Sequence, residues 1–193
     1  QIVRWKSNNP LREYDGLHRK ITMVDGEMSI GGGMNYGDFY SHDRGNAPVK
    51  WRDTDVYFEG PAVADAEALF AKIWNEQLVR PEHQKNSRIV KSPQKKESVS
   101  GSRGMFQVID QNPATHESIM RTNLLLIKAA KTQIDIENAY FISDEAIKAA
   151  LLEALDRGVK VRIYTNSSES IDGPEISGPI LKSTNEMLAR GAQ

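Results

Sequence analysis

The chain has 193 residues, which is long enough for a domain with a substantial core and short for two complete ones. It carries 25 lysines and arginines against 26 aspartates and glutamates, so a net charge of −1 gives no general nucleic-acid footprint. The absence of cysteine excludes disulfide bonds, cysteine-ligated zinc, iron–sulfur clusters and thiol catalysis. No apolar run approaches the roughly 18 residues that a transmembrane helix needs.

The composition divides the chain into two lobes and a linker. Residues 1–80 contain a hairpin pattern, a strand at Asp55–Glu59 and an amphipathic helix from Pro61 to Glu76. Residues 81–103 hold six basic residues against two acidic ones and are rich in Ser, Lys, Gln and Pro, which predicts a flexible basic linker. On composition, a solvated linker is favoured over a nucleic-acid-binding arm.

Residues 104–193 alternate between strand and helix patterns. This alternation predicts an α/β fold with a largely parallel sheet. In such a sheet, ligands bind beyond the carboxyl ends of the strands, here at residues 138–141 and 165–168. The expected strands are Phe106–Ile109, Ile134–Tyr140 and Val159–Tyr164, and the expected helices are His116–Lys131, Asp144–Arg157 and Pro179–Arg190.

The stretch from Leu17 to Tyr40 carries the chemically informative residues. His18 and Lys20 are two residues apart, so on a strand both side chains project from the same face. The dipeptide Asp25-Gly26 is a strong signal for a two-residue hairpin turn.

A turn centred on that dipeptide predicts the register of the hairpin. Paired residue numbers should sum to about 51, which places Lys20 opposite Gly31 and His18 opposite Gly33. Asn35 then lies just beyond, near His18. Glycines opposite the two side chains would let a bulky anionic group approach the backbone closely.

These residue types suit phosphoryl transfer. A histidine serves as nucleophile or general acid/base near neutral pH, and a lysine supplies a fixed positive charge for a phosphate oxygen. An asparagine adds a neutral donor, and the set needs no metal. On spacing alone, an ordinary surface pair and a glycine bend are the more common explanations of the pattern.

The combination of residues is more specific than its parts. The pattern His18-x-Lys20-x4-Asp25-x6-Gly32-x2-Asn35 resembles the signature of the phospholipase D superfamily.

The flanking segments extend the resemblance. Gly32–Tyr40 and Trp51–Val56 are similar to the corresponding stretches of bacterial cardiolipin synthases. In the second lobe, Tyr140-Phe141 and Thr165–Ser167 with Asp172 resemble the start of that family's second half.

The resemblance implies a fold and an organisation. The fold is α/β and phospholipase D-like, with mixed, mostly parallel sheets flanked by helices. Residues 1–80 are expected to be the C-terminal part of a first half that carries the motif, and residues 104–193 the N-terminal part of a second half. Each lobe is then an incomplete half of a two-motif enzyme.

The resemblance also implies roles for the residues of the motif. His18 is expected to attack phosphorus and form a phosphohistidine, while a second histidine protonates the leaving alcohol. Asp25 orients the site and does not transfer protons. The residues expected to hold the substrate phosphate are Lys20, Asn35, Gly32 and Gly33.

The chain contains one complete motif, because none of His42, His83 and His116 has both a lysine two residues later and a matching aspartate after it. We therefore expect another segment of the same polypeptide, or a second chain, to supply the second His-x-Lys motif. A homodimer that shares motifs and an inactive fragment are the other two explanations.

The resemblance implies a glycerophospholipid substrate at a peripheral membrane surface, with hydrolysis or phosphatidyl transfer and no cofactor or metal. It favours the bacterial periplasm, the membrane periphery or secretion.

Tyr140 and Asp172 are candidates for a substrate pocket, although core packing and an ordinary turn explain them as well. A metal-independent nuclease of the same superfamily is the second hypothesis, against which the near-neutral charge argues. The third is a non-catalytic module that binds phosphate or a membrane surface.

Overall fold

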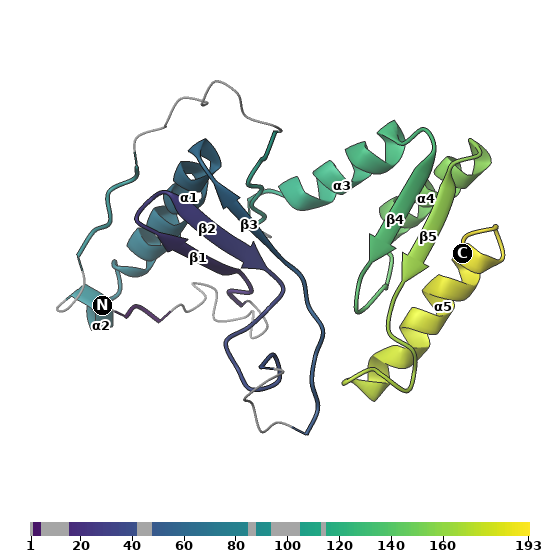
Figure 1. Cartoon of the computed structure of the whole chain (residues 1–193), viewed down its shortest axis with the longest axis horizontal. Coiled ribbons are helices and arrows are strands. Elements are labelled where there is room, and N and C mark those ends of the chain that lie inside the picture. Colours follow the sequence, from purple (N-terminus) through teal and green to yellow (C-terminus); the bar gives the residue numbers. More distant parts are fainter. Residues whose placement is uncertain (1, 5–15, 42–47, 85–87, 94–104, 113–114) are drawn as a thin grey trace. The chain divides into compact units, whose positions relative to one another are not determined.

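The computed structural model describes residues 2–4, 16–41, 48–84, 88–93, 105–112 and 115–193. The chain forms two compact units, Gln1–Val108 and Ile109–Gln193, which are described separately (Figure 1). The expected α/β fold with mixed sheets flanked by helices is confirmed. Both strand pairs of the first unit are antiparallel, and the parallel pair belongs to the second unit.

The first unit is a three-stranded antiparallel sheet with one long helix. Its strands are β1 (Lys20–Val24), β2 (Met28–Gly32) and β3 (Asp55–Glu59), in the order β1-β2-β3. Helix α1 (Pro61–Gln77) packs on one face of the sheet, and Pro61 stands at its start, where the missing N–H costs nothing. The helix buries small and branched residues, Val63, Ala64, Ala66 and Ala71.

The predicted turn is present at Asp25-Gly26. These residues have φ angles of 55° and 66°, the left-handed conformation that both central positions of a type I′ turn require. The Glu27 N–H donates to the Val24 carbonyl over 3.1 Å, which closes the turn.

The register of the hairpin differs from the prediction by one residue. Val24 pairs with Met28, so Glu27 is an extra residue on β2, as in a β-bulge. Lys20 therefore lies opposite Gly32, and the expected pairing with Gly31 is wrong. His18 precedes β1 and lies outside the ladder.

The end of β2 packs tightly against the start of β3. A Cβ atom at position 32 would lie 2.2 Å from Asp55 Oδ1 and 2.5 Å from the Thr54 backbone oxygen. A Cβ atom at position 33 would lie 2.2 Å from Asp53 Oδ1, and its next two nearest atoms belong to the same carboxylate. The close approach at Gly32 thus involves backbone, whereas the one at Gly33 involves a side chain that can rotate.

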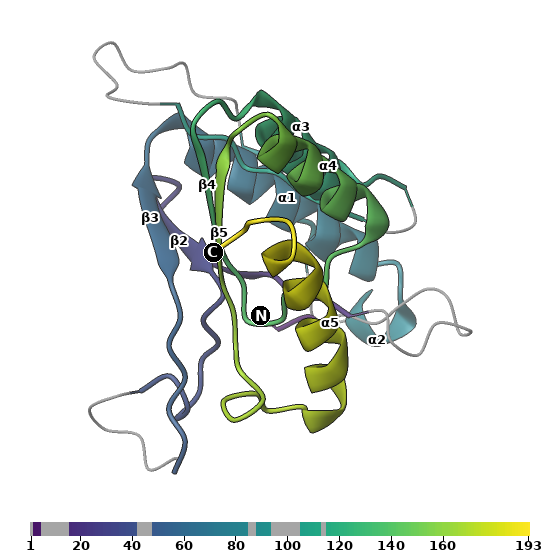
Figure 2. The same cartoon turned by 90° about the vertical axis from the view of Figure 1, so that its right-hand side faces the viewer.

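The second unit is a parallel pair of strands covered on one face by helices. Strands β4 (Gln133–Glu137) and β5 (Lys160–Tyr164) pair in parallel, and the helices lie on one side of them (Figure 2). The helices are α3 (Ser118–Ala129), α4 (Glu145–Asp156), the short 3₁₀ helix η1 (Pro174–Ile176) and α5 (Ser177–Leu188). The buried core between them is Ile127, Phe141, Ala150, Leu151, Ala154, Val159, Val161, Met187 and Ala192.

The other face of this sheet is polar. Asp135 and Arg162 are paired in the register, and the Arg162 guanidinium donates to both carboxylate oxygens over 2.7 and 2.9 Å. This bidentate pair lowers the pKa of Asp135 and raises the pKa of Arg162. Parallel sheets usually have helices on both faces, whereas this face exposes charged side chains.

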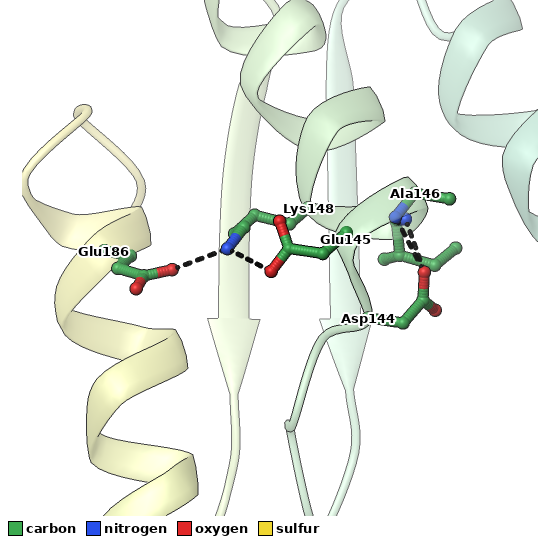
Figure 3. A network of polar contacts seen from close by, with 6 residues as sticks. Asp144, Glu145, Ala146, Lys148 and Glu186 are labelled. Atoms are coloured by element: carbon green, nitrogen blue, oxygen red, sulfur yellow. Dashed lines mark hydrogen bonds and ion pairs between the residues drawn. The ribbon is translucent and has the colours of Figure 1, made fainter.

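Helix α4 is anchored at its N-terminus and against α5 (Figure 3). The Asp144 carboxylate caps it by accepting from the N–H groups of Ala146 and Ile147 over 2.8 and 3.1 Å. Lys148 contacts Glu145 at 2.7 Å and Glu186 of α5 at 3.1 Å, which raises the pKa of Lys148.

Part of the predicted linker is ordered against α1. Residues Pro81–Gln84 form the short helix α2, and Asn75 exchanges two hydrogen bonds with the backbone of Val90, at 2.7 and 2.9 Å. Trp74 Nε1 donates to the Arg88 carbonyl over 3.0 Å. Residues 85–87 and 94–103 of the linker prediction lie outside the described residues.

The strand expected at Phe106–Ile109 is wrong, because these residues join no ladder. The Phe106 ring stacks on Phe58 of β3 with 4.3 Å between centroids. The apolar run therefore packs one half-exposed ring on β3 and does not extend a sheet.

We expect Gly32→Ala to destabilise the first unit more than Gly33→Ala, by about 1–3 kcal/mol, because its Cβ meets backbone that has nowhere to move. Urea unfolding followed by tryptophan fluorescence measures both, since Trp51 and Trp74 belong to this unit. Equal midpoints for the two variants would contradict the packing described above.

Removing the α4 cap with Asp144→Ala is expected to cost about 1 kcal/mol, because two helix N–H groups lose their acceptor. Amide hydrogen exchange on α4 reports the loss. The control is Glu153→Ala, an exposed position within the same helix, where we expect a change within about 0.5 kcal/mol. Equal protection in both variants would show that the cap does not stabilise the helix.

Candidate active site

His18 and Lys20 meet at the start of β1. Lys20 Nζ lies 3.0 Å from His18 Nδ1 and donates to the His18 carbonyl over 2.6 Å. An ammonium group has only donors, so Nδ1 acts as the acceptor, and a neutral imidazole then carries its proton on Nε2. The predicted proximity of the two side chains is present.

A glycine separates this lysine from an aspartate in one row across the sheet. Lys20, Gly32 and Asp55 occupy paired positions on β1, β2 and β3. Directly paired residues of an antiparallel sheet project from the same face, so the row places both charged side chains there. Asp55 Oδ1 lies over Gly32 and accepts from the Met34 N–H over 3.2 Å.

The space beside Gly32 and Gly33 is thus occupied by the chain's own carboxylates, Asp55 and Asp53. Asp53 is held by the Thr54 N–H, which donates to its Oδ1 over 2.8 Å. Glycine is required here for strand packing, which is a different reason from the anion approach that the sequence suggested. Nothing in the local sequence pattern pointed to this role for the two aspartates.

Asn35 follows β2 at the end of the hairpin where His18 precedes β1. Its amide nitrogen donates to the Tyr40 hydroxyl over 3.1 Å. Tyr40 packs edge-on against Trp51, with 5.4 Å between centroids, and Trp51 N donates to the Phe39 carbonyl over 2.8 Å. An aromatic cluster therefore holds the loop that carries Asn35, and Tyr40 is a further residue that the sequence analysis missed.

Asp25 lies at the opposite end of the hairpin from His18. The five residues of β1 separate them, so the two ends of the strand are about 13 Å apart at the usual rise per residue. Asp25 forms the turn with its left-handed backbone and does not contact His18 within the unit.

Tyr140 and Asp172 come together in the second unit, at the carboxyl ends of β4 and β5. The Tyr140 hydroxyl donates to Asp172 Oδ1 over 2.5 Å, and Asn138 Oδ1 accepts from the Tyr140 N–H over 2.9 Å. Phe141 is 6 % exposed and belongs to the core, while its N–H donates to Thr165 Oγ1. Tyr140 and Asp172 therefore lie where ligands of parallel sheets bind.

Two of the remaining histidines have other partners. His83 Nε2 lies 3.0 Å from the Arg4 carbonyl, and His116 Nδ1 lies 3.1 Å from Ser118 Oγ. His42 is outside the described residues. Among the residues that the structure describes, no cluster of three or more His, Asp or Glu side chains could hold a metal ion. No helix in that part of the chain has both the length and the hydrophobicity of a membrane-spanning segment.

Comparison with known proteins gives a consistent result for both units. Residues 124–193 match the family model described as cardiolipin synthase, PLD-like domain. Cardiolipin synthase 1 of Bacillus cereus is 32 % identical over 174 residues, 86 % of this chain and 34 % of that protein.

Two further relatives agree. Cardiolipin synthase A of Pseudomonas aeruginosa is 35 % identical over 154 residues, 78 % of this chain and 29 % of that protein. Cardiolipin synthase 2 of Staphylococcus epidermidis is 31 % identical over 182 residues, 94 % of this chain and 36 % of that protein. The chain spans about a third of the length of the curated relatives it matches. With its motif residues, its mixed α/β architecture and these matches, the chain belongs to the phospholipase D superfamily and resembles the bacterial cardiolipin synthases within it.

Proposed function

We propose that this chain supplies one His–Lys half of a phospholipase D-type site that cleaves or transfers phosphatidyl groups of glycerophospholipids. The observation that carries the proposal is the contact between Lys20 Nζ and His18 Nδ1 at the open end of the hairpin. The relatives support the substrate class, because they are named as cardiolipin synthases.

In this proposal His18 is the nucleophile. One of its ring nitrogens forms a bond to phosphorus while the bond from phosphorus to the leaving alcohol oxygen breaks. The proton for that alcohol comes from a second histidine, which another segment of the polypeptide or a second chain supplies. Water or an acceptor alcohol then takes the phosphatidyl group from the phosphohistidine.

Lys20 has two tasks in sequence. Before substrate binds, it donates to Nδ1 of His18, which leaves the proton on Nε2 and that nitrogen unable to attack. An anionic phosphate competes for the ammonium group, because charge-assisted bonds to phosphate oxygens are stronger than a bond to a neutral imidazole. The released imidazole can then exchange tautomers and present an unprotonated Nε2.

The other expected residues support this chemistry from outside the reacting atoms. Asn35 donates to a phosphate oxygen, and Gly32 and Gly33 shape the strand end beside it. Asp25 acts on orientation by forming the turn. Tyr140 and Asp172 line a substrate pocket, and a peripheral membrane surface delivers the lipid.

His18→Ala in the natural polypeptide is expected to lower phosphatidyl transfer by a factor of about 10⁴ or more, because it removes the imidazole that attacks phosphorus in this proposal. His83→Ala is the control, since that ring contacts the Arg4 carbonyl instead. Rapid acid-free quenching with ³²P-labelled lipid should trap label on a histidine peptide that contains residue 18. Label on the protein that persists in His18→Ala would contradict the assignment of the nucleophile.

Turnover is expected on phosphatidylglycerol vesicles, at a rate that excess EDTA does not change. Single-stranded DNA under the same conditions is expected to give no product above the His18→Ala background. Cleavage of the DNA into shorter strands at a rate comparable with that of lipid turnover would replace the lipid assignment with the nuclease one.

A further inference from the structure

Asp55 occupies the space that Gly32 leaves empty. It starts β3 and pairs with Gly32, and its Oδ1 lies where a Cβ atom of residue 32 would stand, within 2.2 Å. The carboxylate therefore extends from β3 over the backbone of β2, toward the strand that carries Lys20.

This carboxylate makes a bond to the segment that follows β2. Its Oδ1 accepts from the Met34 N–H over 3.2 Å, one residue before Asn35. The donor lies beyond the last residue of β2, where the ladder with β1 and β3 no longer holds the backbone. The Tyr40 hydroxyl holds the Asn35 side chain itself, so Asp55 and Tyr40 restrain this segment from two sides.

We propose that Asp55 is a positioning residue, which fixes the backbone between Gly32 and Asn35 so that Asn35 is held beside the His18–Lys20 end of the hairpin. The proposal rests on the proposed function, in which Asn35 binds the substrate phosphate. It assigns Gly32 a second purpose, because any larger residue would exclude the carboxylate from its place.

Two substitutions at position 55 distinguish the hydrogen-bond acceptor of Asp55 from its negative charge. An asparagine keeps an oxygen acceptor in the same place, whereas an alanine leaves the Met34 N–H without its acceptor. If position is what matters, Asp55→Asn should retain most of the activity that Asp55→Ala loses. Glu59→Ala is the matched control: Glu59 is a carboxylate on the same strand and face, paired with Met28 at the turn end.

The test combines steady-state kinetics on phosphatidylglycerol vesicles with amide hydrogen exchange, using the natural polypeptide. Asp55→Ala is expected to lower kcat/KM about tenfold, Asp55→Asn to stay within about threefold of the unmodified protein, and Glu59→Ala to leave it unchanged. The Met34 amide should lose protection in Asp55→Ala alone, while amides within β1 and β2 keep theirs.

The outcomes are distinct. Unchanged Met34 protection in Asp55→Ala, or unchanged kcat/KM when that protection is lost, overturns the positioning role. Equal losses in Asp55→Asn and Asp55→Ala overturn it too, because they assign the effect to charge. If the unmodified protein does not turn over lipid, the proposed function fails, whatever the exchange measurement shows.

Discussion

The approach of β3 to the end of β2 is the constraint on which the candidate site depends. The two strands come so close at Gly32 that a single methyl group would collide with backbone oxygen as well as with a carboxylate. In this row of the sheet, Lys20 and Asp55 lie on either side of Gly32. The close approach also brings an acceptor to the N–H of Met34, just where the ladder ends. Sheet packing and site geometry therefore have the same cause.

The residues of the motif divide into two groups by what they do physically. His18 and Lys20 are in direct contact and carry the groups that can react with a phosphodiester. Asp25 and the glycines act on the backbone: Asp25 adopts the left-handed turn conformation, and Gly32 admits a neighbouring strand. A motif that looks like one chemical unit in the sequence is thus a reactive pair together with the structural residues that fix the strands beside it.

Both units have a sheet with helices packed on one face, and their other faces differ. In the second unit that face carries the bidentate Asp135–Arg162 pair, which satisfies its own charges. In the first unit it carries Lys20 and Asp55 together with half-exposed apolar residues such as Ile30 and Tyr57. In the proposed function, a face of mixed chemistry next to His18 suits contact with an amphipathic ligand.

Local patterns in the sequence were sufficient to predict β3, α1, α4, the Asp25-Gly26 turn and the contact between His18 and Lys20, because these depend on neighbours a few residues apart. The register required the tertiary structure, since a single bulged residue, Glu27, moves Lys20 from Gly31 to Gly32 and leaves no signal in the pattern. The prediction of a strand at Phe106–Ile109 is wrong for a similar reason. An apolar run indicates that its side chains pack against other residues, and only the tertiary structure decides that Phe106 packs on Phe58. Asp53 and Asp55 lie beside Gly33 and Gly32, about 20 positions earlier in the chain. Only the pairing of β2 with β3 brings these residues together.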